Sequence, residues 1–155
     1  MRATRVFTVL AAVGAIGMAC GDDTTGIPAD VEIWRARPMN GANERPTPVT
    51  TTATGEAVIT IIGNLVSWKV DITSGITGVT AGHIHRRHPD STAGGVIQGV
   101  SPTTGGTNFT GTLALGSAVI LVDSVLAIIR AGRAYVNIHT STNPGGEIRG
   151  DLVKQ

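Results

Sequence analysis

AYVNIHTSTNPGGEIRGDL, residues 134–152, is the stretch that decides the fold of this chain. Apolar and polar residues alternate on both sides of the NPGG segment at 143–146, which is typical of two short strands joined by a turn. Strand side chains point to opposite faces in turn, so Val136 and Ile138 share one face and define the core side. The other side of the hairpin is polar. Its predicted members are Asn137, His139, Glu147, Arg149 and Asp151.

The register of this hairpin follows from keeping its apolar face apolar. A two-residue turn would place His139 opposite Gly150, on the face of the apolar residues of the return strand. A type I turn followed by Gly146 in the left-handed conformation adds one residue and places His139 opposite Asp151. A one-residue slip moves every side chain to the other face. We therefore predict the bulged register.

Three motifs in this chain resemble the signatures of one known domain family. They are MNGANERP at 39–46, AGHIHRRHPDSTAGGV at 81–96 and YVNIHTSTNPGGEIRGDL at 135–152. Their sequence and order resemble the chordin-type CHRD domain, over residues 32–152. That family occurs in chordin, which binds bone-morphogenetic growth factors, and in bacterial secreted proteins. The resemblance implies a sandwich like those of immunoglobulins or copper–zinc superoxide dismutases, with a short helix before the final hairpin.

The rest of the chain also favours an all-β fold. Gly, Thr, Val and Ile are plentiful, and short alternating segments are separated by turn residues. LVSWKVDI at 65–72 is the clearest half-buried strand, with Trp68 as a core residue. The segment 119–131 predicts the helix, capped by Asp123 or Ser124 and stopped by Gly132. We predict a Greek-key β-sandwich of about eight strands.

The N-terminus has the pattern of a targeting segment. Arg2 and Arg5 precede an apolar run at 6–18, and Cys20, the single cysteine, follows small residues. This boundary resembles the lipobox of bacterial lipoproteins, which implies an exported protein of the cell envelope with a membrane anchor at Cys20. The alternative is an ordinary secretory peptide cleaved after Ala19. We divide the chain into a signal peptide at 1–19, a polar tether at 20–30 and one CHRD domain at 31–155.

Charge and composition limit the partners of the domain. Lys and Arg total 12 against 11 Asp and Glu, a formal net charge of +1, and no basic cluster is present. Such a domain lacks the electrostatic footprint of a nucleic-acid-binding protein, so we exclude that partner class. A protein partner for the polar face stays open, as in chordin.

The histidines are the candidate metal ligands. His83 and His85 lie two residues apart, so on a strand they share a face at a Cα separation of ~6.6–6.8 Å. Their imidazoles suit copper or zinc, with His139 as the third ligand and Asp151 as a partner that orients it. HIH followed by a Gly- and Asp-bearing loop also resembles the copper-binding strand of superoxide dismutases. The further metal-binding histidines and the disulfide of those enzymes have no counterparts here. His88 lies in a predicted loop.

The same residues allow a purely structural interpretation. In that interpretation the histidines hydrogen-bond loop carbonyls, and Arg149 pairs with Glu147 or Asp151 in a surface network. Asn43 and Glu44 match the family's loop motif, and we interpret them as turn chemistry plus a surface carboxylate.

No nucleophile motif stands out, so we expect no enzyme, with superoxide-dismutase-like oxidoreductase chemistry as the runner-up. The sequence therefore predicts an envelope-tethered binding or structural module. The alternative function is a copper- or zinc-binding protein.

Overall fold

The computed structural model describes residues 30–89, 93–100 and 109–155. The predicted signal peptide, Cys20 and nearly all of the predicted tether lie outside the described residues. Within these ranges the chain forms nine strands, one α-helix and one 3₁₀ turn. These are β1 (Val31–Asn40), η1 (Gly41–Asn43), β2 (Thr54–Ile62), β3 (Leu65–Ile76), β4 (Val79–Arg86), β5 (Val96–Gly99), β6 (Phe109–Ile120), α1 (Asp123–Arg130), β7 (Ala134–Thr140), β8 (Ile148–Asp151) and β9 (Val153–Lys154).

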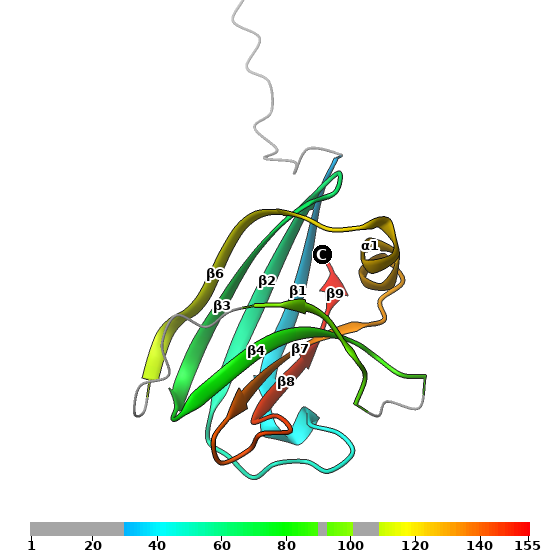
Figure 1. Ribbon diagram of the computed structural model, residues 1–155. Helices are drawn as coiled ribbons and strands as arrows, with labels where there is room; N and C mark the ends of the chain where they lie inside the picture. Colours follow the sequence, from blue (N-terminus) through cyan, green and yellow to red (C-terminus); the bar gives the residue numbers. More distant parts are fainter. Residues whose placement is uncertain (1–29, 90–92, 101–108) are drawn as a thin grey trace, which may run out of the picture.

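All of these strands belong to one curled antiparallel sheet. Its order is β5-β4-β7-β8-β1-β2-β3-β6, and β9 pairs with β1. In Figure 1 the half with β4, β7 and β8 lies in front of the half with β1, β2, β3 and β6. Side chains from both halves form a single hydrophobic core. The all-β prediction, with one short helix before the final strands, is confirmed; a continuous sheet curls over the core in the manner of a sandwich.

The hairpin of β2 and β3 shows why the core lies inside this curl. Val66, Trp68, Val70 and Ile72 are buried, as their alternation predicts. The residues between them point to the outer surface, where Lys69 is exposed. One face of the sheet is therefore sealed by apolar side chains, and the other faces water.

β7 lies between β4 and β8, and this position builds the polar face discussed below. Against β4, His83 pairs with Asn137 and His85 pairs with Tyr135. Because directly opposite residues point to the same side of a sheet, the two histidines share a face with Tyr135 and Asn137. His139 has the same parity on β7, so it joins that face.

The predicted register of the last hairpin is wrong, although the predicted faces are right. Tyr135, not His139, lies opposite Asp151, and pairing ends at Ile138 opposite Ile148. A wide loop closes the hairpin instead of a tight turn, since β7 continues to Thr140 along β4. The shift is an even number of residues, so each side chain keeps the face that alternation assigns to it.

The helix is shorter than predicted and has a different cap. Residues 119 and 120 extend β6, where they pair with β3, so α1 begins only at Asp123. Val122 occupies the N-cap position without a side-chain hydrogen bond. Gly132, with φ 65°, ends the helix as predicted. Within the described ranges, no helix has the length and apolar character needed to cross a membrane.

Candidate functional site

Three histidines, two neighbours on β4 and one on β7 that is distant from them in sequence, converge on the polar face of these strands. The Nδ1 atom of His83 lies 3.0 Å from the Nε2 atom of His139. One nitrogen from each of His83, His85 and His139 can be chosen so that all three atoms lie within 4.8 Å of one another. The fourth histidine, His88, is exposed and does not belong to this group. The structure thus brings together the three histidines that the sequence singled out.

Backbone carbonyls determine which nitrogen of each ring stays available. The Nδ1–H of His139 donates to the carbonyl oxygen of Pro144 at 2.9 Å, so its Nε2 is the acceptor of the bond from His83. The Nδ1–H of His85 donates to the carbonyl oxygen of Gly94 at 2.8 Å. His85 Nε2 is buried, and nothing in the described part of the chain hydrogen-bonds to it. This nitrogen is an acceptor whose partner is missing.

Tyr135 supports the cluster from the side. Its ring stacks on the ring of His85 with centroids 4.9 Å apart and planes 6° from parallel. Its hydroxyl oxygen accepts a hydrogen bond from the backbone N–H of Gly94 at 3.0 Å. Gly94 therefore holds His85 with its carbonyl group and Tyr135 with its N–H group. Rotation of either ring would break one of these bonds.

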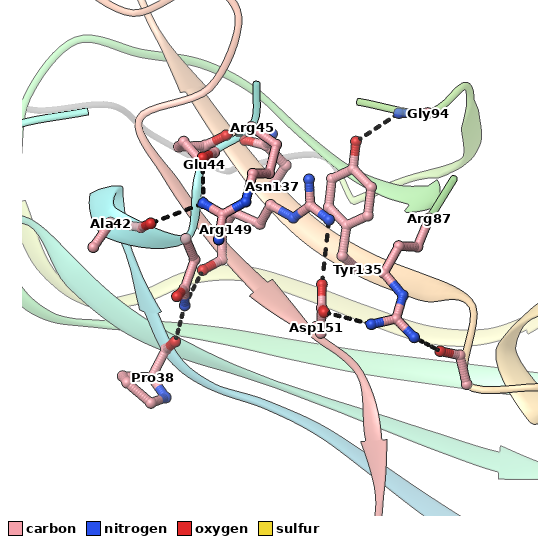
Figure 2. A network of polar contacts seen from close by, with 12 residues as sticks. Pro38, Ala42, Glu44, Arg45, Arg87, Gly94, Tyr135, Asn137, Arg149 and Asp151 are labelled. Carbon is pink, nitrogen blue, oxygen red and sulfur yellow. Dashed lines mark hydrogen bonds and ion pairs between the residues drawn. The ribbon is translucent and has the colours of Figure 1, made fainter. Parts of the chain in front are cut away.

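An arginine covers Tyr135 from the side of β8. The guanidinium carbon of Arg149 lies 3.5 Å from the centre of the Tyr135 ring, a cation–π contact. Arg149 is buried, and it pairs with Asp151 at 3.3 Å. Asp151 also pairs with Arg87 at 3.0 Å (Figure 2). Asp151 thus pairs with two arginines, of which Arg149 covers Tyr135, while the carbonyl of Pro144, and not Asp151, orients His139.

Glu44 is the residue whose surroundings differ most from the expectation. The sequence interpretation placed a surface carboxylate here, but Glu44 is only 3% exposed. Its Oε2 accepts a bond of 3.3 Å from the amide of Asn137, while Glu44 Oε1 and Asn137 Oδ1 find no partner among the residues described. Both orphaned atoms are acceptors, so a proton on the carboxyl group would remove part of the mismatch.

Burial has the largest effect on the ionisation of Glu44. It raises the pKa from 4.5 to about 7, against the opposing attraction of Arg149. The 141–147 loop closes over this group: a side chain at Gly146 would come within 2.6 Å of Asn137 and Glu44. Only the position of Glu44 in the MNGANERP motif pointed to it in the sequence.

Glu147 also has a role other than the predicted one. Its carboxylate accepts hydrogen bonds from the side chains of Thr51, Thr140 and Asn143. These hydrogen bonds lower its pKa, although desolvation is the largest single influence and acts the other way. Glu147 therefore stiffens the loop that carries the carbonyl group facing His139.

The three clustered histidines favour the neutral form. Desolvation is the largest cause that lowers the pKa of His83, of His85 and of His139. The mutual proximity of the rings adds to this effect for His83 and His85. Neutral imidazole is the form that binds metal ions, because the coordinating nitrogen must be unprotonated.

Fold and site together define a class: a curled antiparallel β-domain with a histidine cluster on the polar face of its closing strands. The model of the CHRD domain family matches residues 36–152. This chain therefore belongs to the CHRD domain family, as its three motifs suggested. No curated protein and no solved structure matches the chain significantly.

Gly94 offers a test of how tightly the site is held. A Cβ atom there would lie 1.7 Å from the carbonyl oxygen of Arg86, whereas one at Gly95 would meet nothing within 4 Å. Gly94→Ala should lower the free energy of unfolding by about 1–3 kcal/mol, the usual cost of overpacking. Gly95→Ala is the matched control and should change it little. Equal thermal unfolding temperatures for the two variants would contradict this account.

Glu44→Gln should change how stability depends on pH. The unfolded carboxyl group ionises near 4.5 and the folded one near 7, so wild-type stability falls relative to the variant as pH rises between these values. The expected relative loss by pH 8 is roughly 3 kcal/mol, from 1.36 kcal/mol per pKa unit. Denaturant unfolding of both proteins across this pH range measures the difference in stability. The histidines are present in both proteins, so their titration cancels in this difference. A constant difference would show that Glu44 is not buried as described.

Proposed function

We propose that this chain is an exported, lipid-anchored binding module, and that its ligand is a copper or zinc ion held by His83, His85 and His139. One observation carries the metal proposal: the Nε2 atom of His85 is buried beside two other imidazoles, and no described residue hydrogen-bonds to it. A buried acceptor without a donor is costly. A cation at the centre of the three rings would satisfy it.

The spacing of the ligand atoms supports this proposal. Bonds of ~2.0–2.1 Å in tetrahedral geometry place ligand nitrogens ~3.3 Å apart. The nitrogens of His83 and His139 are 3.0 Å apart, and the whole set lies within 4.8 Å. Small side-chain rotations would therefore suffice. The metal ion would replace the hydrogen bond between His83 and His139, with the His83 proton moving to its other nitrogen.

The surroundings of the rings also suit a metal ion. Metal-binding histidines typically donate their second N–H to a carbonyl or carboxylate, which fixes the ring and its tautomer. His85 does this to Gly94, and His139 does it to Pro144. These bonds, which a structural role also explains, would here orient ligands. The positive charge of Arg149 is balanced by Asp151.

Binding, rather than catalysis, is the function we expect. His83 is only partly buried, so a metal ion could keep one position open to solvent. That open position makes superoxide-dismutase-like chemistry the runner-up. If the copper-loaded protein dismutates superoxide, this oxidoreductase activity, rather than simple binding, is the function.

Metal titration tests the site. The purified full chain, stripped with a chelator, should bind one equivalent of Cu²⁺ or Zn²⁺ in calorimetry, and the ion should raise its unfolding temperature. His83→Gln and His139→Gln should each weaken binding by more than roughly 10–100-fold, the cost of losing a residue that only orients a metal ligand. His88→Gln is the matched control and should bind like wild type. Equal affinity of all variants, or no binding by the wild type, would refute the proposed site.

The anchor is tested separately, by mass. The charged and apolar residues before Cys20, and the polar GDDTTG that follows it, support lipidation at this cysteine. Protein extracted from bacterial membranes should begin at Cys20 and carry a diacylglyceryl adduct in its intact mass. A soluble product that begins at Cys20 with a free thiol would exclude the anchor while leaving export intact.

A further inference from the structure

A row of apolar side chains crosses four strands at one end of the sheet, and its members on β2, β3 and β6 are exposed. Val31 pairs with Ile62, Ile62 with Leu65, and Leu65 with Ile120. The exposed fractions are 46% for Ile62, 42% for Leu65 and 68% for Ile120. Val122, just after this row, is 66% exposed. We call Ile62, Leu65, Ile120 and Val122 the apolar rim.

Beyond the rim the outer face is mostly polar, although Leu115, opposite Lys69, is 69% exposed. One row further along the strands, Thr60 lies opposite Ser67. The next two rows carry ion pairs: Arg35 with Glu56 at 3.4 Å, and Lys69 with Asp71 at 2.7 Å. A step of two residues along a strand is ~6.6–6.8 Å. Apolar surface therefore changes to charged surface within ~13 Å of the rim.

The predicted anchor lies close to the rim in the sequence. Ten residues, 21–30, separate Cys20 from Val31, which is the first residue of the same cross-strand row. Ten residues span no more than ~36 Å even at full extension. A lipid on Cys20 would hold the rim close to the membrane surface.

We propose that the apolar rim rests on the lipid bilayer that carries the Cys20 anchor. This inference rests on the proposed function, because it requires the lipidated cysteine. In water, much of the apolar surface of these side chains is exposed. When this end of the domain rests on the bilayer, that surface is buried against the acyl region, which is favourable. The area of the rim alone would bind a bilayer weakly. Because the anchor keeps the rim near the membrane, the rim can still orient the domain.

Charges near the rim make this an apolar contact rather than an attraction to anionic headgroups. Glu32 pairs with both Arg130, at 2.8 Å, and Lys154, at 3.2 Å. Asp30 and Asp123 are exposed at the same end and add negative charge. The nearby cations are therefore already balanced. Seating of the rim should depend little on salt.

This orientation has a consequence for the histidine cluster. In Figure 1 the turn between β2 and β3 lies at the top, where β1 begins, and the loop after β7 lies at the bottom. That loop carries Pro144, whose carbonyl holds His139. A domain seated on its rim would present the loop and the histidines away from the lipid, open to ions from the surrounding solution.

Two labelled variants on one strand test the seating. Ile120→Cys and Leu115→Cys both lie on β6 and are 68% and 69% exposed in the parent residues, but only Ile120 belongs to the rim. Each full chain is produced in a bacterium, extracted with its lipid adduct, labelled with a polarity-sensitive fluorophore and placed in phosphatidylcholine–phosphatidylglycerol vesicles with brominated acyl chains. The label at 120 should shift to the blue and lose emission; the label at 115 should do neither.

The other outcomes would each overturn a stated part. Equal behaviour of the two labels in protein that carries the adduct overturns the seating and leaves the anchor intact. A label at 120 that is shielded from iodide but not quenched by brominated lipid means that a second copy or another protein covers the rim, which also overturns the seating. Absence of the diacylglyceryl adduct in the intact mass overturns the anchor itself, and the seating with it.

Discussion

The antiparallel pairing of β4 with β7 is the constraint on which the polar face depends. It sets His83 opposite Asn137 and Ala81 opposite His139, so His83 and His139 are diagonal neighbours across two hydrogen-bonded strands. A slip by one residue would turn His139 into the core and destroy the cluster. Ile84 and Ile138, which alternate with the polar residues of the two strands, are fully buried on the opposite face. A slip would turn one of them out of the core, so their burial opposes it. Core packing thus enforces the register that the histidine cluster requires.

A second feature of this face is the number of polar groups taken out of water. Glu44, His85, Asn137 and Arg149 are all buried, although the burial of charged or unpaired polar groups is unfavourable. Some of the cost is offset locally: Arg149 contacts Tyr135 and Asp151, and Asn137 donates to Glu44. The rest is visible as acceptor atoms of Glu44, His85 and Asn137 that have no hydrogen-bond partner within the described ranges. Such groups concentrate where a protein binds or reacts, and here Asn137 lies directly opposite His83 in the cluster.

The two ends of the domain differ in chemistry in a way that suits an anchored protein. One end carries the apolar rim beside the first residue of β1, and the other carries the Thr140–Glu147 loop with its hydrogen-bonded carboxylate. The strands between them are long enough to separate a bilayer from the histidine cluster. In the arrangement that we propose, the lipid would attach the domain, the rim would orient it and the histidine cluster would face the solution.

The sequence by itself determined the all-β class, the family, the faces of β7 and β8 and the identity of the three histidines, because alternation and short motifs are local properties. It also placed Trp68 in the core. Only the tertiary structure decided the hairpin register. The turn residues are compatible with a tight bulged hairpin, but Thr140 pairs with β4, and this pairing makes the loop longer. The tertiary structure alone decided that Glu44 is buried, because Asn137 and Arg149, which surround it, lie about 100 residues further along the chain. The convergence of His83 with His139, 56 residues apart, likewise required the crossover that makes β4 and β7 neighbours. Local patterns specify which face a side chain takes; only long-range strand pairing specifies what it meets there.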